Sequence, residues 1–251
     1  MRCRMVMRKA SDVSQGWGSS MVSRKVRLLW GFALIFSGMI SIRGTLIAAP
    51  PKLLEDESRE FRISVDGKNA GIYRMRISRY DDGTESVRGD SELTLNFVVF
   101  KYRMKSEGTE VWKDGHFVKL ANQSDFNGDK YVVQASATDQ DFTYVVNGSK
   151  HRTTSDIWVS SYWHEPQPEK AGTVMRLFDV DTGKELEGTL TKIGMETIAI
   201  GAQRKAAAHY SLRGDVKVDL WYDANHRLVR QEVIDSGHKS ILQMESVKSS
   251  P

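Results

Sequence analysis

The sequence lacks several residues and motifs that mark enzymes and metal proteins. Its only cysteine is Cys3, near the N-terminus, so the rest of the chain can form no disulfide, thiolate metal site or cysteine nucleophile. A lipid anchor on a later cysteine is excluded for the same reason. The sequence contains neither a G-x-S-x-G nucleophile elbow nor a glycine-rich phosphate loop. The otherwise ordinary composition excludes disordered, collagen-like and multispan membrane proteins.

The chain also lacks an excess of positive charge outside its N-terminal segment. The chain carries 36 Lys and Arg against 32 Asp and Glu, a formal net charge of +4. Residues 1–49 hold eight of the basic residues and one acidic residue, which leaves 28 basic and 31 acidic residues in positions 50–251. That remainder has a net charge of −3, whereas a nucleic-acid-binding domain should be basic in its folded part. No nucleic-acid partner is therefore predicted.

An export signal is predicted near the N-terminus. Basic residues at 24–27 precede the apolar run 28–42, and two small alanines follow at 48–49. At ~1.5 Å per residue this run spans only ~22 Å, which is shorter than the ~30 Å hydrocarbon core of a bilayer. We therefore assign residues 21–49 to a signal peptide and residues 1–20 to a mis-assigned start or an extension. The expected location is the periplasm or cell envelope; the alternative is anchoring by an uncleaved N-terminal segment. Membrane contact is expected only through this leader.

From residue 59 to residue 249 the sequence predicts a single all-β domain. Turn pairs of Asn or Asp with Gly separate runs of strand-like sequence: Asp66-Gly67, Asp82-Gly83, Asp114-Gly115, Asn127-Gly128 and Asn147-Gly148. These pairs accept the positive φ of tight hairpin turns. Their spacing implies roughly a dozen antiparallel strands. We expect one large antiparallel sheet curled into a half-barrel or open barrel, with one or two short helices. A polar, acidic linker is expected at residues 50–58.

The clearest strand pattern lies between Val216 and Val247. Runs at 216–223 and 227–235 are followed by a third run from Ser240. Apolar residues occupy alternate positions of the first run, the period of a strand with one buried face. Trp221 lies on the opposite face, among charged residues. We expect the apolar face to complete the core and Trp221 to be the aromatic most available to a ligand.

One segment, residues 155–164, interrupts this pattern. Three large aromatic residues lie within six of its positions: Trp158, Tyr162 and Trp163. Asp156 could cap a short helix, which the prolines at 166 and 168 would end. A linker would not expose three large aromatics to solvent. We therefore interpret the segment as a crossing element between two halves of one sheet.

The turn and aromatic motifs together resemble a known family. They are Asp66-Gly67, Ser161-Tyr162-Trp163-His164, Asp181-Thr182-Gly183, Leu220-Trp221-Tyr222-Asp223, Arg227-Leu228-Val229 and Asp235-Ser236-Gly237. The pattern is similar to that of exported bacterial β-proteins of unknown function, and the likeness covers most of residues 58–247. That family resembles the lipoprotein-carrier half-barrel, an incomplete antiparallel barrel around a hydrophobic groove. The resemblance implies a fold and a compartment and brings no catalytic residues.

The motifs that resemble metal or catalytic sites have simpler interpretations. The six histidines form no pair with metal-ligand spacing. Residues 179–185 resemble the start of a calcium loop, but the glycine falls one place early and the distal glutamate is missing, so a hairpin turn is predicted. Gly89 is expected to mark a bulge in a long strand. We predict no metal, no cofactor and no catalytic residue.

The aromatic residues remain the only indication of a ligand site. Trp112 and four other aromatics could line a groove for an acyl chain or stack on sugars. The four predicted ligand contacts are Trp158, Tyr162, Trp163 and Trp221. The alternative is that these aromatics fill the core. Our first hypothesis is a non-enzymatic envelope protein that binds an amphipathic ligand, a lipid or a glycan. A structural or interaction module without a ligand, and an envelope enzyme with dispersed catalytic residues, remain alternatives. An apolar cavity of at least ~300 Å³ would favour binding, and a filled interior would favour the module.

Overall fold

The computed structural model describes residues 49–96, 101–201 and 203–250, and the chain divides into two units near residue 50. The β domain that follows this division is described by itself. The predicted signal peptide and the extension before it lie outside the described residues, apart from Ala49. Within the described part, no helix is both long enough and apolar enough to span a membrane.

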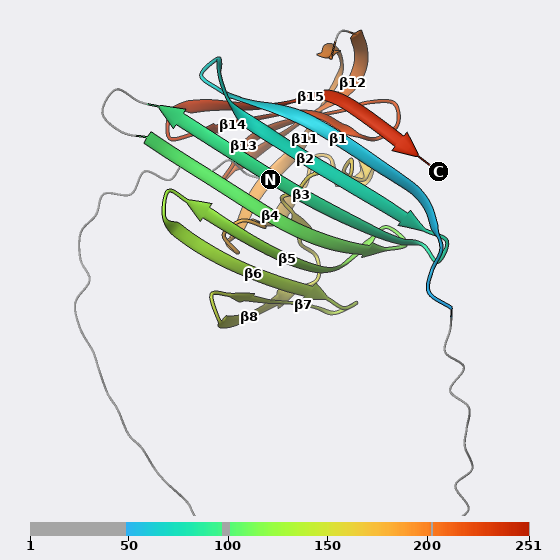
Figure 1. The fold of residues 1–251 in the computed structure, drawn as a ribbon. Coiled ribbons are helices and arrows are strands. Elements are labelled where there is room, and N and C mark those ends of the chain that lie inside the picture. The colour runs from blue at the N-terminus through green and yellow to red at the C-terminus, as the bar shows by residue number, and fades with distance from the viewer. Residues whose placement is uncertain (1–48, 97–100, 202, 251) are drawn as a thin grey trace, which may run out of the picture. The chain divides into compact units, whose positions relative to one another are not determined.

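The domain is one sheet of 15 strands (Figure 1). The first half contains β1 (Leu53–Val65), β2 (Lys68–Tyr80), β3 (Thr84–Asn96), β4 (Lys101–Lys113), β5 (His116–Phe126), β6 (Asp129–Ala137), β7 (Asp141–Val146) and β8 (Ser149–Thr154). The second half contains β9 (Trp158–Val159), β10 (Val174–Phe178), β11 (Glu185–Ile200), β12 (Gln203–Gly214), β13 (Lys217–Tyr222), β14 (Leu228–Asp235) and β15 (His238–Ser250). The predicted all-β, largely antiparallel sheet is confirmed.

Each half of the sheet is a meander in which neighbouring strands are also neighbours in sequence. The hairpin turns follow the predicted chemistry, with positive φ at Asp66 (49°), Asn127 (57°) and Asn147 (49°) and at the glycines that follow them. The two halves meet in the middle of the sheet, where β1 pairs antiparallel with β15 and Arg59 lies opposite Val247. The chain ends of the domain therefore occupy central strands, and the edges belong to β8 and β9.

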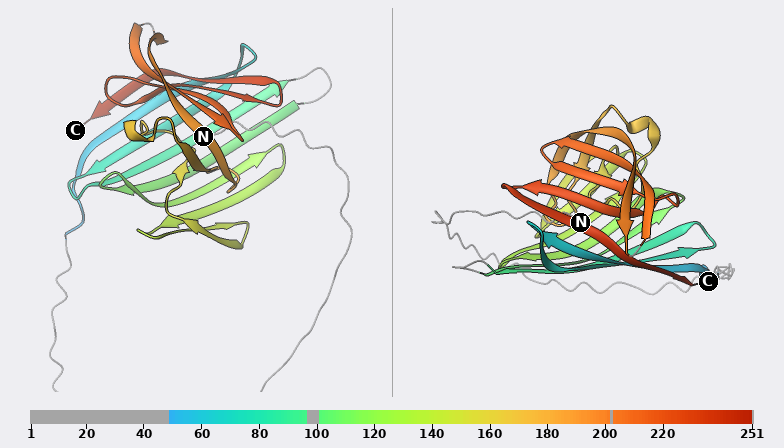
Figure 2. Two further views of the ribbon diagram at one scale, coloured as in Figure 1. Left: turned by 180° about the vertical axis from the view of Figure 1, so that it is seen from behind. Right: turned by 90° about the horizontal axis from the view of Figure 1, so that it is seen from above.

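The sheet curls so that its two edges approach each other (Figure 2). Side chains rather than backbone pairs join them along what we call the seam, formed by Tyr144, Thr153, Arg176, Phe178 and Glu185. Glu185 accepts hydrogen bonds from the Tyr144 hydroxyl at 2.8 Å, from Thr153 at 3.1 Å and from Arg176 at 2.8 Å. The rings of Phe178 and Tyr144 pack with centroids 5.0 Å apart. The sheet is thus an open barrel held together by side chains.

The expected linker at residues 50–58 is largely wrong, because β1 already begins at Leu53. Its acidic residues pair with basic partners instead of remaining in solvent. Glu55 binds Arg79 at 2.9 Å, and Asp56 forms an ion pair with Arg76 of β2. Opposite charges on neighbouring strands stabilise such pairs, which extends the strand into a segment that looked like a polar linker.

The predicted short helix at Asp156 is also wrong. Asp156 forms an ion pair with Lys170 at 3.3 Å and caps no helix. Two residues later the chain enters β9, which pairs in parallel with β10, the one parallel pair among the described strands. Within the described residues the only helical turn is a 3₁₀ turn at Pro168–Lys170. Residues 155–164 do connect the two halves of the sheet, as predicted.

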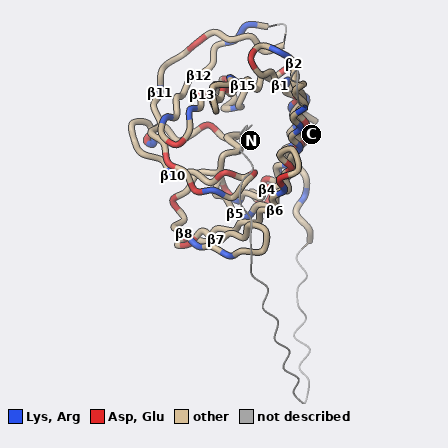
Figure 3. Tube along the Cα trace, turned by 90° about the vertical axis from the view of Figure 1, so that its left-hand side faces the viewer, with Lys and Arg blue, Asp and Glu red and all other residues tan. Residues whose placement is uncertain are grey.

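The strands bury alternate residues on the inner face of the curled sheet. Val218, Leu220 and Tyr222 of β13 are fully buried, which confirms the apolar face predicted for this strand. Residues of both charge signs lie along β1, β2 and β4, as the tube in Figure 3 shows. Arg74 of β2, for example, lies 3.3 Å from Glu60 and 3.7 Å from Asp90. Such exposed pairs each contribute little, about 0 to 1 kcal/mol.

Candidate functional site

A pair of glycines shapes the inner face of the sheet between β3 and β4. Gly89 and Gly108 lie directly opposite each other, and the strands pair here without a register shift, so the predicted bulge at Gly89 is wrong. A Cβ atom at Gly89 would lie 2.7 Å from the Tyr73 hydroxyl, and one at Gly108 would lie 2.2 Å from the Asn122 side-chain oxygen. The glycines therefore make room for these two polar side chains over the sheet.

The turn between β10 and β11, residues 179–184, packs against this part of the inner face. Asp181 is only 1% exposed. Its Oδ1 accepts hydrogen bonds from Ser106 Oγ at 2.5 Å and from Asn122 Nδ2 at 3.2 Å. Its backbone carbonyl accepts a third from Ser124 Oγ at 2.6 Å. Side chains of β4 and β5 thus hold the β10–β11 turn against the inner face of the sheet.

Asp179 stabilises the turn from within. Its Oδ1 accepts a hydrogen bond from the Asp181 backbone N–H at 3.2 Å, and its Oδ2 accepts one from Thr182 Oγ1 at 2.8 Å. Because both oxygens bind the turn itself, this segment is the predicted turn and not a calcium loop. Among the described residues, no group of three or more His, Asp, Glu or Cys is placed to hold a metal ion.

A small polar cavity lies between the turn and the sheet. It has a volume of about 30 Å³, and Tyr73, Glu110, Ser161 and Asp181 are among the residues that line it. Trp112 Nε1 donates to Glu110 Oε2 at 2.9 Å. Asp181 Oδ2 is buried without a hydrogen-bond partner in the described part of the chain, and the Ser161 side chain faces Glu110. The cavity has the volume and the polar partners for one or two water molecules, since each needs about 10–15 Å³.

Burial changes the acidity of both carboxyl groups at this cavity. It raises the pKa of Asp181 to about 6, and the neighbouring charge of Asp179 adds to the rise. Burial also raises the pKa of Glu110, although the Trp112 N–H partly counters it. A carboxyl group that titrates near pH 6 changes charge within the range that cells encounter. The cavity is too small for a substrate, so this chemistry concerns protons and water.

Three of the four predicted ligand residues lie together in the crossing element. Tyr162 and Trp163 are 1% and 2% exposed, and Trp158 is half-buried. The rings of Trp158 and Tyr162 pack 4.9 Å apart, and that of Trp163 lies 5.6 Å from Trp112. The Tyr222 hydroxyl donates to the Tyr162 carbonyl at 2.9 Å, which ties the crossing element to β13. These aromatics fill the inner side of the sheet.

Trp221, the fourth predicted residue, lies on the outer face of β13. It is 6% exposed, because the outer ends of β11 and β12 cover it. Its ring stacks on His209 with centroids 4.2 Å apart, and its Nε1 donates to Glu196 Oε2 at 2.9 Å. The Arg230 guanidinium lies 5.6 Å from the ring centre. The sheet separates Trp221 from the other three, so the four residues do not line one groove.

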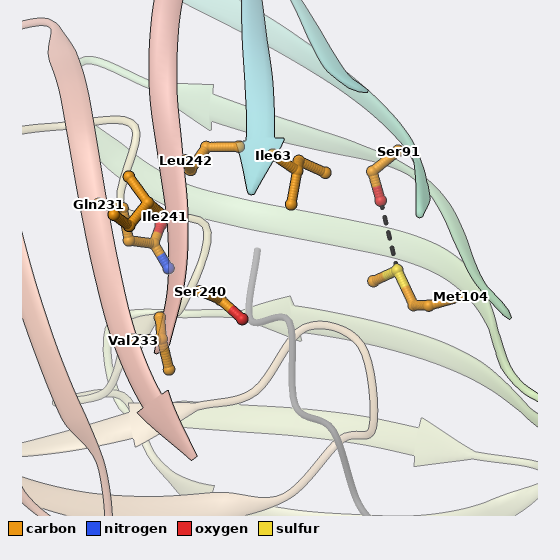
Figure 4. A pocket seen from close by; sticks show the side chains of 8 residues that line it. All are labelled: Ile63, Ser91, Met104, Gln231, Val233, Ser240, Ile241 and Leu242. Carbon is orange, nitrogen blue, oxygen red and sulfur yellow. Dashed lines mark hydrogen bonds between the residues drawn. The ribbon is translucent and has the colours of Figure 1, made fainter. Parts of the chain in front are cut away.

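A second cavity on the inner side is apolar and smaller, about 20 Å³. Figure 4 shows its lining, which includes Ile63 of β1, Met104 of β4 and Leu242 of β15. None of the predicted aromatics lines it. Its volume is far below the ~300 Å³ expected of a small-molecule pocket.

Residues 61–244 match the family described as "Domain of unknown function (DUF6134)". The chain belongs to this family. No curated protein matches the chain in sequence. A crystal structure described as "Beta-barrel-like Protein of Domain of Unknown Function DUF1849 from Brucella abortus" is similar in fold, with a TM-score of 0.59 and 7% identity. The match covers 78% of this chain and 98% of that one. At this identity the likeness concerns the fold alone.

The DUF6134 domain also contains a buried ion network that the sequence did not indicate. Glu57 is 1% exposed and binds Arg59 at 2.5 Å and Arg227 at 2.8 Å. Burial alone would raise the pKa of Glu57, but the two guanidinium groups hold it below its usual range. Positions 57 and 227 pair only because β1 meets the second half of the sheet. No local pattern could have revealed this contact.

Proposed function

We propose that this DUF6134 protein is an exported, non-catalytic interaction module of the cell envelope that works through its outer surface. The observation that carries the proposal is the filled inner side of the sheet. The crossing element places Tyr162 and Trp163 there, and the β10–β11 turn occupies the space beside them. A domain without an internal groove binds its partners through its outer surface. This supports an interaction module over a carrier of an amphipathic ligand.

Features of the outer face are consistent with contacts to other proteins. Exposed ion pairs between Arg and Glu lie along β1 to β4. Two apolar side chains of β11 are also well exposed, Ile193 at 55% and Met195 at 65%. Mixed charge with a few exposed apolar residues suits a protein surface better than nucleic acid. Export is supported by residues 24–49, in which basic residues are followed by an apolar run and then by small residues.

The decisive experiment is native mass spectrometry of the protein isolated from the envelope fraction. We expect the mass of the polypeptide alone, because two of the cavities measure only about 20 and 30 Å³. A third hollow, of about 260 Å³ over β4, β5 and β6, is shallow and has exposed polar residues such as Glu107 and Gln134 in its lining. A stoichiometric adduct of lipid or glycan mass would contradict the module and support the alternative, an amphipathic ligand held inside the half-barrel. A screen of lipid extracts against the purified protein provides an independent test of the same point.

Export is tested separately with residues 1–60 fused to a reporter enzyme that is active only outside the cytoplasm. We expect activity from the fusion and its loss in a Leu34→Arg variant, because a charge in the apolar run prevents insertion. Cytoplasmic retention of the unaltered fusion would contradict the proposed location. N-terminal sequencing of the exported product distinguishes a cleaved signal from an uncleaved anchor.

A further inference from the structure

The carboxyl group of Asp181 has an unusual position in this fold. It stands at the centre of the β10–β11 turn, contacts β4 and β5, and lines the polar cavity with its second oxygen. Asp179 and Glu110 add two further buried carboxyl groups within the same region, 0% and 6% exposed. Burying a carboxyl charge is costly, and the two hydrogen bonds to Asp181 Oδ1 offset only part of that cost.

Protons are a better compensation than a metal ion. Both oxygens of Asp179 bind the turn itself, and Asp181 Oδ1 already accepts two hydrogen bonds. A cation would find one free oxygen on Asp181, the Ser161 hydroxyl and the carboxyl group of Glu110, too few for the six or more ligands that calcium takes. A protonated Asp181 needs only a water molecule in the cavity to accept its proton.

The turn is also connected to the seam. Its first residue follows Phe178 and its last precedes Glu185, and both of these neighbours hold the two edges of the sheet together. Gly183 within the turn sits against β7, where an added Cβ would lie 2.2 Å from a methyl group of Val146. Displacing the turn would therefore pull on the side chains that close the barrel.

We propose that the β10–β11 turn is a proton-dependent latch, seated on β4 and β5 while Asp181 carries its proton and released when Asp181 ionises. Release loosens the seam and lets the edges formed by β8 and β9 separate. The groups that face Asp181 come from each element packed on it: Asp179 from its own turn, Glu110 and Ser106 from β4, Asn122 and Ser124 from β5, Tyr73 from β2 and Ser161 from the crossing element. The charge of Asp179 opposes the ionisation of Asp181, whereas the hydrogen bonds from Ser106 and Asn122 favour it.

The sign of the pH effect follows from the raised pKa of Asp181, about 6 in the folded protein against an ordinary 3.8. A carboxyl group of this kind stabilises the fold at low pH and loses that contribution as the pH rises through its folded pKa. From this group alone, the unfolding equilibrium constant at pH 8 should be about tenfold larger than at pH 5. The latch is thus closed in acid and weakened at neutral pH.

The test compares the wild type with Asp181→Asn, which keeps the shape of the side chain and mimics the protonated state. In urea unfolding of the full chain, the unfolding equilibrium constant of the wild type should be about tenfold larger at pH 8 than at pH 5. The variant should lack this difference. Hydrogen exchange of residues 178–185 and 141–154, scaled for the intrinsic rate at each pH, should rise at pH 8 in the wild type only. Asp129→Asn, an exposed residue of β6, is the matched control and should behave as the wild type.

Two outcomes would overturn the latch. One is an identical pH profile for wild type and Asp181→Asn; the other is loss of the profile in Glu110→Gln instead, which would move the titration to the other carboxyl group. If the asparagine variant does not fold, infrared spectroscopy of wild type labelled with ¹³C-aspartate decides directly. A band from a protonated aspartic acid at pH 5 that disappears with a midpoint near pH 6 supports the latch, and its absence at pH 5 refutes it.

Discussion

Replacing Trp221 by Phe tests whether the outer end of the β11–β12 hairpin covers this residue in solution. The substitution removes the indole N–H that donates to Glu196 Oε2 at 2.9 Å and shortens the ring that stacks on His209. A hydrogen bond to a charged group contributes about 1.5–3 kcal/mol. Because the Glu196 side chain is 45% exposed, solvent reduces this to roughly 1 kcal/mol. The smaller ring loses a further ~1 kcal/mol of apolar burial, so we expect about 2 kcal/mol in total.

A double-mutant cycle separates the hydrogen bond from the packing. Trp221→Phe, Glu196→Ala and the double variant are compared by urea unfolding, followed by circular dichroism because the substitution removes a fluorophore. We expect a coupling energy of about 1 kcal/mol between the two positions. Lys217→Ala, an exposed residue on the same face of β13, is the matched control and should change stability by less than ~0.5 kcal/mol.

The coupling should also depend on pH. The Trp221 N–H and His209 hold the pKa of Glu196 below its usual 4.5. Their stabilising contribution is therefore present above that value and is lost as the pH falls through the lower folded pKa. If Trp221→Phe has no measurable effect on unfolding and no coupling to Glu196, the hairpin end does not cover the residue. Trp221 would then be available to a ligand, as the strand pattern alone indicated.

Two further substitutions test the filled interior. Trp163→Ala should lower the free energy of unfolding in urea by about 3–5 kcal/mol, because the residue is 2% exposed. Trp158→Ala, at a half-buried position, should lower it clearly less. Equal losses would argue against the packing described for the crossing element. Gly108→Ala should lower the free energy of unfolding by about 1–3 kcal/mol, because its Cβ would lie 2.2 Å from the Asn122 oxygen. Adding Asn122→Ala to this variant should recover part of the lost stability. No recovery would place the strain elsewhere.

The local features of this fold were predictable from the sequence. Hairpin turns at Asp66, Asn127 and Asn147 depend on the conformations that Asn, Asp and Gly accept, and alternation in β13 depends only on the geometry of a strand. Both are properties of short windows. The same short windows misassigned residues 50–58, because the ion pairs that make this segment a strand involve distant residues: Arg76 and Arg79 of β2, and Arg227 just before β14.

The candidate site could not be predicted, because it depends on contacts between distant segments. Asp181 looks in sequence like an ordinary turn residue, and its burial results from the packing of the β10–β11 turn against β4 and β5. The face of Trp221 was predicted correctly from alternation. Its cover was not, because β11 changes register between Lys192 and Gly194 and brings Glu196 over the ring. A bulge of this kind has no clear sequence signal.

The central pairing of β1 with β15 has a consequence for how the chain reaches this structure. Arg59 and Val247 are opposite each other but 188 positions apart in sequence, so this ladder closes a very long loop. Such non-local pairing slows folding. The paired ends, Asp56 and Ser250, could be joined by a short linker, and new ends opened in the connection at residues 155–157 between β8 and β9. In that circular permutant every pair of antiparallel strands becomes a local hairpin, and the chain should fold faster while keeping the same sheet.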